Sequence, residues 1–279
     1  MKNKLLPILA VIILIAAAGI ALYPTVSQIV NEMLSESAIM QYNDTVDTLS
    51  SENKAAQFAE AEEYNRGLNE VVSDSFSSEA FAGDDRYNSI LKITDDGQIG
   101  TINIPSIDCR LPIYHGNSEA MLSKGAVHLA GTAFPIGGSS TRCVISAHTA
   151  FPGKIFFDRL SEVEIGESFS VTVLGDSYYY KVTDIKTVLP DEVEYLQPEK
   201  GKDLITLVTC TPYALNTHRL LVTGERDTTP RVELSEPETV QGKPVDLGLS
   251  AALIALVIVT GSILIKRAIK RKRKMRHEK

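Results

Sequence analysis

Two long apolar segments lie near the two ends of this 279-residue chain, and they constrain its fold more than any other feature. Residues 5–23 form a nearly unbroken apolar run preceded by Lys2 and Lys4, and residues 247–265 form a second run without an internal charge. A helix needs about 20 such residues to cross the hydrocarbon core of a membrane. Both runs therefore predict membrane-spanning helices.

The second run is followed at once by a basic tail. Residues 266–279 hold nine Lys or Arg against one Glu, in a chain whose net charge is −7. Basic residues flank the cytoplasmic ends of spanning helices, so we expect both termini inside the cell and the domain between the spans outside. The position of the tail favours anionic lipids of the cell membrane as its partner, and nothing in the acidic remainder suggests nucleic-acid binding.

The N-terminal run also has an interpretation as a cleaved signal peptide, because residues 16–18 are three alanines. Its apolar stretch is longer than the ~7–15 residues of a signal core, and the residues after it look helical. An uncleaved anchor is therefore favoured, with cleavage as the alternative.

The region between the spans changes character along the chain. Apolar residues recur at helical spacing in the first part, as at Phe58, Ala61, Tyr64 and Leu68, and a break at residues 50–51 offers a capping serine. Residues 73–88 lose this periodicity. From residue 99 onwards, short apolar runs alternate with Gly, Pro and Asp, which predicts a mainly β domain, a barrel or sandwich whose closure would remove exposed edges. The runs are residues 99–104, 109–114, 143–147, 169–174, 178–185, 204–209 and 220–224.

The sequence therefore divides into an anchor, a helical region, a connector, a β domain, a tether, a second span and a tail. We place these segments at residues 1–27, 28–72, 73–98, 99–226, 227–245, 246–266 and 267–279.

Three polar residues at the ends of predicted strands carry the strongest functional signal. Cys210 ends one apolar strand, and Arg219 begins the next after a short turn. His148 ends an earlier strand. Together they supply a nucleophile, an anion stabiliser and a proton-transfer group. Each alone would be a packing or surface residue, so the prediction rests on their combination.

The remaining Cys and His residues give weaker evidence of function. Cys109 and Cys143 are either one disulfide or two buried apolar side chains, and we favour unpaired thiols. His128 is interpreted as structural and His115 as a loop residue. The Cys and His residues lack close metal-ligand spacing, so no metal site is predicted.

Several sequence blocks around these residues match one family. They are Ile-Pro-Ser-Ile at 104–107, Leu-Pro-Ile-Tyr at 111–114, Gly-Ala-Val-His-Leu-Ala-Gly-Thr at 125–132, Ile-Ser-Ala-His at 145–148, Phe-Phe-Asp-Arg-Leu at 156–160, Thr-Leu-Val-Thr-Cys-Thr-Pro-Tyr at 206–213 and Asn-Thr-His-Arg-Leu at 216–220. In this order, and between two spans, they resemble the sortases, and among these the pilin-polymerising class C enzymes. The resemblance implies a closed sortase-type barrel with N-terminal helices and a lid.

The resemblance also implies a mechanism. Cys210 would attack the Thr–Gly bond of an LPxTG-like sorting signal and form a thioester, with His148 as acid and base and Arg219 at the oxyanion or the substrate backbone. Thr209 and Thr211 would support the oxyanion or contact substrate. A lysine amine on another pilin subunit would accept the acyl group, and no cofactor would take part.

A lid is the last feature that the resemblance implies. Class C sortases typically cover the active site with an Asp-Pro-aromatic tripeptide, and Asp74, Ser75 and Phe76 occupy the corresponding place. Ser75 replaces the usual proline, whose fixed φ stiffens the backbone, so the lid is expected to be looser.

Two alternatives to pilin polymerisation follow from the same residues. One is a wall-anchoring sortase or thiol hydrolase that uses a peptidoglycan amine or water as acceptor. The other is a membrane-held binding module without activity, which is disfavoured because all three catalytic positions hold suitable residues.

Overall fold

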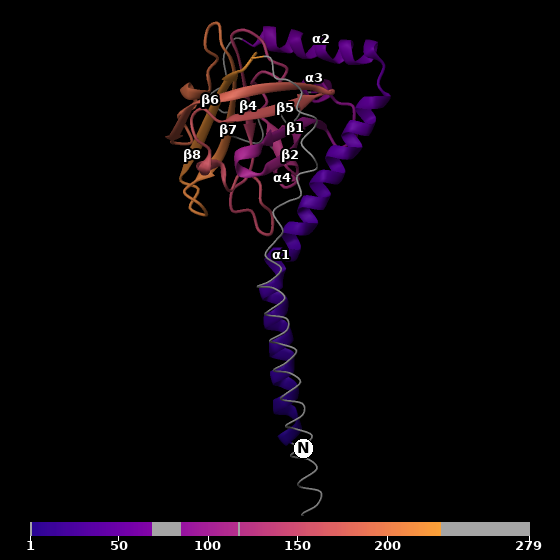
Figure 1. The fold of residues 1–279 in the computed structure, drawn as a ribbon, viewed down its shortest axis with the longest axis vertical. Helices are drawn as coiled ribbons and strands as arrows, with labels where there is room; N and C mark the ends of the chain where they lie inside the picture. The colour runs from indigo at the N-terminus through magenta and orange to yellow at the C-terminus, as the bar shows by residue number, and fades with distance from the viewer. Residues whose placement is uncertain (1, 69–84, 117, 230–279) are drawn as a thin grey trace, which may run out of the picture. The chain divides into compact units, whose positions relative to one another are not determined.

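The computed structural model describes residues 2–68, 85–116 and 118–229 (Figure 1). The chain divides into two compact units, residues 1–30 with 236–279 and residues 31–235. Among the described residues, one helix, over Ile12–Thr48, is long and apolar enough to span a membrane, a property that anchors and signal sequences share. The predicted lid (Asp74, Ser75 and Phe76), most of the tether, the second span and the basic tail lie outside the described residues.

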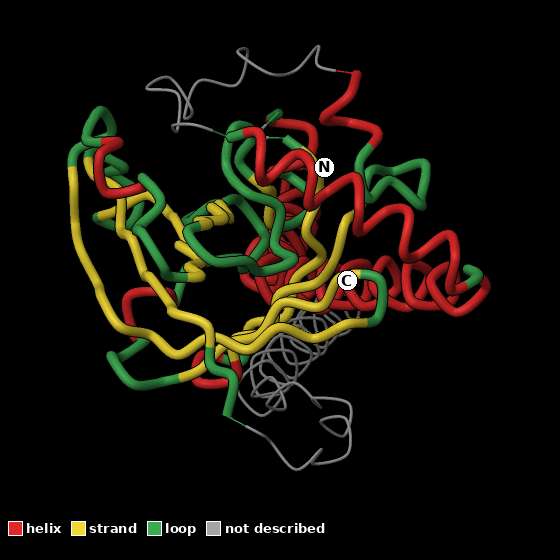
Figure 2. Tube along the Cα trace, turned by 90° about the horizontal axis from the view of Figure 1, so that it is seen from above, coloured by secondary structure: helices red, strands yellow, loops and turns green. Residues whose placement is uncertain are grey.

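Eight strands close into a barrel, as the sequence predicts for a mainly β domain (Figure 2). Their order around the barrel is β1-β2-β3-β4-β7-β8-β6-β5. The pairs β2–β3 and β4–β7 are parallel, and the other neighbours are antiparallel. The strands are β1 Gln98–Ile104, β2 Cys109–His115, β3 Ala126–His128, β4 Thr141–Ser146, β5 Ser168–Val173, β6 Asp176–Val188, β7 Asp203–Thr211 and β8 His218–Arg226.

All seven predicted strands are present, with bounds that differ by a few residues at their ends. The sequence analysis missed β3, whose three residues, Ala126–His128, are too few to show an alternating pattern. His115, expected in a loop, is instead the last residue of β2 and is buried. That expectation was wrong because the polar residue ends an otherwise apolar strand.

Two long helices account for the expected helical region, residues 28–72, and the first of them begins already in the N-terminal anchor. Helix α1 (Lys2–Thr48) ends just before the predicted break, and α2 (Ser51–Gly67) begins just after it. The Ser50 hydroxyl accepts a hydrogen bond from the Asn53 amide at 3.2 Å, which satisfies one of the free donors at the start of α2. Figure 1 shows α2 lying across one end of the barrel.

One buried tyrosine fixes the end of α1 to the barrel. The Tyr42 hydroxyl donates to the Ile99 carbonyl at 2.8 Å and accepts from the Leu174 amide at 3.2 Å. Two backbone groups from distant parts of the sheet are thereby satisfied by one side chain.

The connections hold short helices. They are α3 Asp85–Ser89, α4 Glu119–Leu122, η1 Pro105–Ile107, η2 Leu160–Glu162 and η3 Val193–Leu196. Helix α3 falls in the segment that was expected to be irregular, because its five residues are too few to show a period.

The barrel is packed on both sides of β7. Alternate residues of this strand, such as Ile205 and Leu207, point into the main core. Val208, on the same face as Cys210, belongs to a separate apolar cluster that includes Leu196 of η3. The cluster consists of Leu129, Val144, Val188, Leu196, Val208 and Leu221. The connection that carries η3 therefore covers the outer face of the sheet.

Candidate active site

Two of the three predicted catalytic residues lie on the neighbouring strands β7 and β8, and His148 lies two residues beyond the end of β4, the strand on the other side of β7. Cys210 on β7 is the register partner of Arg219 on β8. In the parallel pair β4–β7, Ser146 is the register partner of Val208, so continuing the register by two residues places His148 at the level of Cys210. The fold brings together residues that the sequence could only place at separate strand ends.

The backbone on both sides of His148 is fixed by hydrogen bonds. The Ala147 amide donates to the Val208 carbonyl at 3.1 Å, and the His148 carbonyl accepts from the Phe157 amide at 3.0 Å. The Thr209 hydroxyl donates to the Ala147 carbonyl at 2.8 Å. The end of β4 is thus held against β7 beyond its last paired residue.

Thr209 and Thr211 occupy different environments. Thr209 is buried, and its hydroxyl is engaged by Ala147, so it supports the His148 segment from the strand next to it. Thr211 is half-buried at the end of β7, where it is the register partner of His218.

Cys210 is the accessible thiol of the three. All three cysteines are free, which agrees with the favoured prediction, but Cys109 and Cys143 are buried while Cys210 is half-buried. Burial raises the pKa of the Cys109 thiol to about 12 and raises the pKa of Cys143 well above its ordinary value. A thiol is nucleophilic as its thiolate, so the two core cysteines are unsuited to attack a substrate.

His148 lies between a carboxylate and an aromatic ring. Its Nε2 is 3.5 Å from Oε1 of Glu119 on α4, and its ring centroid is 5.0 Å from that of Phe151. A quarter of its side chain is exposed. The imidazole is thus held in place while one edge stays open to a reactant.

Arg219 is half-buried at the start of β8. Its Nη1 donates to the His218 carbonyl at 3.2 Å and more weakly to the Asn216 carbonyl at 3.4 Å. These contacts anchor the guanidinium in the β7–β8 connection, beside the strand that carries Cys210. A permanently charged fork of donors at this place is suited to a developing oxyanion.

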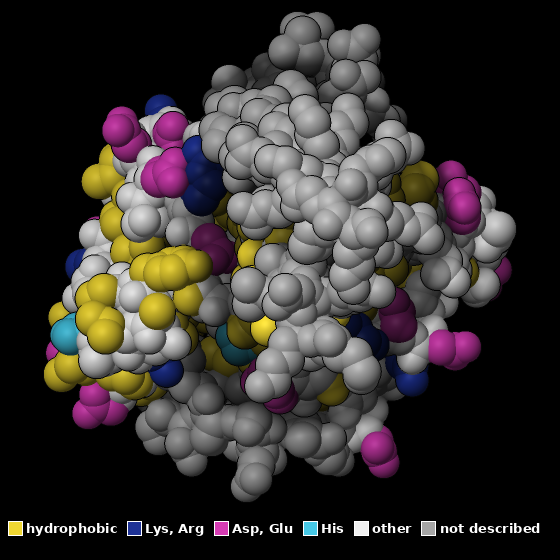
Figure 3. Space-filling view, turned by 90° about the horizontal axis from the view of Figure 1, so that it is seen from below, with side chains coloured by type: hydrophobic (Ala, Val, Ile, Leu, Met, Phe, Trp, Pro, Cys, Tyr) yellow, Lys and Arg dark blue, Asp and Glu magenta, His cyan; other side chains and the backbone are white. Residues whose placement is uncertain are grey.

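Exposed apolar side chains surround this end of β7. Tyr213 and Leu215 in the β7–β8 connection are 65% and 71% exposed. Figure 3 shows hydrophobic side chains gathered on one side of the described surface, with acidic and basic side chains around them.

His128 is structural, as the sequence analysis interpreted it. It is fully buried, with Nδ1 2.9 Å from the Tyr87 hydroxyl and Nε2 3.0 Å from the Ala133 carbonyl. Burial lowers its pKa to about 3. Among the described residues, no group of three or more His, Cys, Asp or Glu side chains is placed to hold a metal ion.

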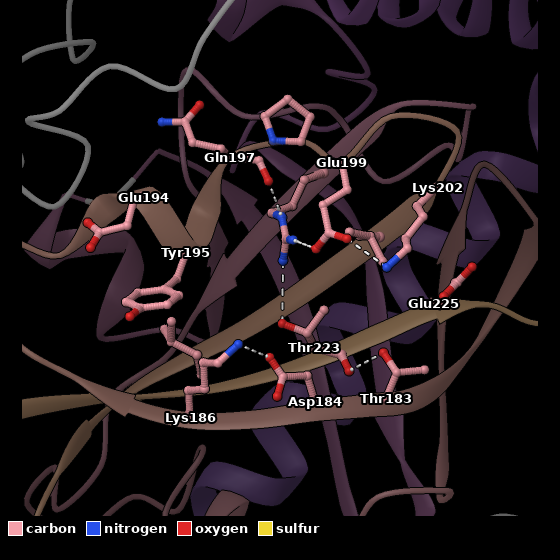
Figure 4. Close-up of a pocket in the computed structure, with 14 residues that line it drawn as sticks. Thr183, Asp184, Lys186, Glu194, Tyr195, Gln197, Glu199, Lys202, Thr223 and Glu225 are labelled. Atoms are coloured by element: carbon pink, nitrogen blue, oxygen red, sulfur yellow. Dashed lines mark hydrogen bonds and ion pairs between the residues drawn. The ribbon is translucent and has the colours of Figure 1, made fainter.

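A cavity of about 420 Å³ lies away from Cys210, between the η3 connection and strands β6 and β8 (Figure 4). At its base, buried Arg142 donates to the Gln197 carbonyl at 2.7 Å, to the Thr206 hydroxyl at 2.7 Å and to Glu199 at 2.8 Å. This network ties the η3 connection to β4 and β7. This network could not be predicted from the sequence, because the partners of Arg142 lie 55–81 residues away along the chain.

Comparisons with known proteins agree with this geometry. Residues 102–227 match the family described as the Sortase domain. The chain is 41% identical to sortase C1 from Streptococcus agalactiae, with a TM-score of 0.64, and the match covers 70% of this chain and 99% of that structure. A pilus-related sortase C of Group B Streptococcus is 37% identical, with a TM-score of 0.63 and coverage of 68% and 97%.

A relative known by sequence is more distant. Sortase A of Streptococcus agalactiae serotype III is 33% identical over 136 residues, which are 47% of this chain and 53% of that protein. The chain thus matches about half the length of this relative, whereas it spans nearly all of the two solved structures. The chain spans nearly all of two solved sortase structures at 37–41% identity, and it therefore belongs to the sortase family of cysteine transpeptidases.

Proposed function

We propose that the chain is a membrane-held class C sortase, which cleaves an LPxTG-like sorting signal between Thr and Gly and transfers the acyl group to a lysine amine of another pilin subunit. Two features of the strand register support this proposal: Cys210 faces Arg219 on the neighbouring strand, and the end of β4, two residues before His148, pairs with β7 beside Val208. The similarity to a pilus-related sortase C supports the acceptor class.

In the first half-reaction, the Cys210 sulfur attacks the carbonyl carbon of the threonine, and its thiol proton passes to His148. The negative charge that develops on the carbonyl oxygen is stabilised by Arg219, aided by the end of β7 near Thr211. His148 gives a proton to the glycine nitrogen as the C–N bond breaks, which leaves a thioester on Cys210 and frees the glycine amine.

In the second half-reaction, the amine of a pilin lysine attacks the thioester carbonyl. His148 takes a proton from this amine, the C–S bond breaks, and the Cys210 thiolate leaves. The product is an isopeptide bond, and the enzyme returns to its starting state. No step needs a cofactor, because bond cleavage and bond formation balance in charge and in protons.

The membrane arrangement is part of the same proposal. We place residues 5–23 and 247–265 across the membrane with both termini in the cytoplasm, so that the barrel faces the surface proteins outside. The basic residues 266–279 then meet anionic lipid headgroups on the inner side.

The test uses the full chain in detergent micelles, an LPxTG peptide and a lysine-bearing peptide, followed by intact-mass analysis. We expect a peptide adduct on the protein and a coupled product, both absent in Cys210→Ala. Cys109→Ala is the matched control, since Cys109 is a buried thiol that should not react. An adduct that persists in Cys210→Ala would disprove the assignment of the nucleophile.

Wall anchoring remains the second candidate, because the residues of the proposed site do not specify the acceptor amine. The same reaction run with a peptidoglycan-like glycine amine in place of lysine separates the two. Preferential coupling to the glycine amine would favour wall anchoring, and failure of both acceptors with no adduct would favour a binding module.

The predicted lid is tested separately. If Asp74 and Phe76 restrain access to the active site, Asp74→Ala with Phe76→Ala should speed alkylation of Cys210 by a small thiol reagent. An unchanged rate would contradict the lid. The control is Cys210→Ala, which should show no fast alkylation in either background.

A further inference from the structure

A carboxylate outside the catalytic set faces one nitrogen of the catalytic histidine. Oε1 of Glu119 lies 3.5 Å from Nε2 of His148. This separation is longer than the about 2.7–3.2 Å of an ordinary N–H···O hydrogen bond. Hydrogen bonds in resting active sites are often long and shorten when substrate binds, so a small side-chain adjustment would complete this one.

The two ring nitrogens of His148 have different surroundings. Nε2 is buried and has no hydrogen-bond partner within bonding distance. Nδ1 is not among the buried atoms without a partner, and no hydrogen bond engages it within the described part of the chain, so it is the nitrogen that reaches solvent. The open edge of the imidazole is therefore the Nδ1 side.

This asymmetry decides where the proton of the neutral imidazole belongs. Neutral imidazole carries one N–H and one acceptor nitrogen, and an ionised carboxylate can only accept. A lone pair on buried Nε2 would point at the negative charge of Glu119 without a donor, whereas an N–H there points at an acceptor. The favoured tautomer of His148 carries its proton on Nε2.

Glu119 is held in place by the short helix that carries it. Ser118 caps α4, with its hydroxyl accepting from the Met121 amide at 3.4 Å. At the other end of α4, Nζ of Lys154 donates to the Ser123 carbonyl at 2.5 Å. Lys154 comes from the β4–β5 connection, which also carries His148, so α4 and the histidine are joined at two points.

We propose that Glu119 is a positioning residue for His148, which accepts the Nε2–H, fixes this tautomer and leaves Nδ1 to exchange protons at the reaction centre. This inference rests on the proposed sortase function for its consequence, although the tautomer itself does not. In the catalytic cycle, the imidazolium would give the proton on Nδ1 to the leaving glycine amine, which leaves the neutral Nε2–H tautomer. Nδ1 of this neutral ring would later take a proton from the incoming lysine, while Glu119 accepts the Nε2–H throughout.

Other charged or titratable groups lie on the elements around His148. Lys154 lies over the ring of Phe151, which packs against the imidazole. Asp158 accepts from the amides of Ala150 and Phe156 and so shapes the connection. Cys210 lies on β7, the strand next to β4, and Arg219 lies on β8, the strand after that. Within this group, Glu119 is the carboxylate in direct contact with the imidazole.

The first experiment reads the tautomer directly. The full chain, labelled with ¹⁵N-histidine in detergent micelles, is studied by NMR at a pH where the imidazole is neutral, with His148→Gln to assign the signal. We expect a protonated Nε2 and an unprotonated Nδ1. Glu119→Met should give a mixture of tautomers, and Glu119→Gln should keep the Nε2–H form because its amide oxygen can accept. A wild-type proton on Nδ1 would overturn the proposal.

The second experiment connects the tautomer to turnover. For peptide transfer we expect Glu119→Met to lower kcat/KM by roughly two- to fivefold, the range of an exposed charged pair. Glu119→Gln should recover part of this loss. Glu164→Gln should change nothing, because Glu164 is an exposed carboxylate elsewhere on the surface that makes no ion pair within the described part of the chain. Lys154→Met loosens α4 but keeps the carboxylate, so it should shift the tautomer clearly less than Glu119→Met does.

Two outcomes contradict the role of Glu119. If Lys154→Met shifts the tautomer as strongly as Glu119→Met, the position of α4 matters and the carboxylate does not. If the histidine spectrum of Glu119→Met is the same as that of the wild type, Glu119 does not act as the acceptor for the Nε2–H of His148. Neither reading needs a sorting peptide, so failure of the proposed sortase reaction would be distinguishable from failure of this inference.

Discussion

Arg142 offers a prediction whose size can be worked from its contacts. The substitution Arg142→Met keeps most of the apolar stem but removes a guanidinium whose side chain is 4% exposed. Lost with it are hydrogen bonds to the Gln197 carbonyl and the Thr206 hydroxyl, each 2.7 Å long, and an ion pair with Glu199. We therefore expect the η3 connection to lose its main attachment to the barrel.

The magnitude follows from two opposing effects. Each hydrogen bond from a charged donor contributes about 1.5–3 kcal/mol. Burying the guanidinium costs part of this, as the lowered pKa of Arg142 shows, with burial its first cause. Glu199 is half exposed and can be hydrated after the change, so its loss adds little. We expect the free energy of unfolding to fall by about 2–3 kcal/mol, or roughly 5–10 °C in melting temperature for a domain of this size.

The assay is thermal and urea unfolding of the full chain in detergent, with Arg110→Met as the matched control. Arg110 pairs with Glu36 at 3.0 Å, but both side chains are more than a third exposed, so we expect a loss of less than about 1 kcal/mol. If Arg142→Met lowers the free energy of unfolding no more than Arg110→Met does, the reasoning is refuted. The cost of burying the guanidinium would then equal the free energy gained from its hydrogen bonds and ion pair.

Three further changes test the packing and the buried polar groups. Burial lowers the pKa of His128 to about 3, so between pH 6.5 and about 3 the unfolded chain binds a proton at His128 that the folded chain does not. The free energy of unfolding of the wild type should therefore fall as pH falls through this window, by up to about 1.4 kcal/mol per pH unit. His128→Gln should flatten this slope in urea unfolding. Gly224→Ala should lower the free energy of unfolding by about 1–3 kcal/mol, since its Cβ would lie 2.6 Å from the Phe169 ring; an unchanged melting curve would show that the ring can move away. Tyr42→Phe should cost about 2–3 kcal/mol in the same assay, because two buried backbone groups lose their partner, and a cost below about 0.5 kcal/mol would mean that they find another.

The strands could be predicted where burial leaves a pattern in the sequence. Residues 168–173 alternate between half-buried and buried positions, as their sequence alternates. Residues 204–209 read as a continuous apolar run because β7 is covered on both faces, by the main core and by the cluster under η3. The three residues of β3 and the five of α3 carry no such period, so they were missed.

The candidate site was predictable in its residues but not in its surroundings. Cys210, His148 and Arg219 stand in recognisable sequence blocks at strand ends. Glu119 and Arg142 stand in no such block, and their contacts join segments that are far apart in the chain. Side-chain contacts of this kind depend on the three-dimensional register, which a single sequence does not specify.

The pairing of β4 with β7 has a consequence for how the enzyme becomes active as it folds. Cys210 and Arg219 lie on one hairpin, nine residues apart, and can meet through local folding. His148 joins them only through a parallel pairing of strands about 62 residues apart, a contact that forms late because a long loop must close first. A newly made chain would thus bring the Cys210 thiol and the Arg219 guanidinium together before His148 reaches them. The proposed site is complete only when β4 has docked on β7.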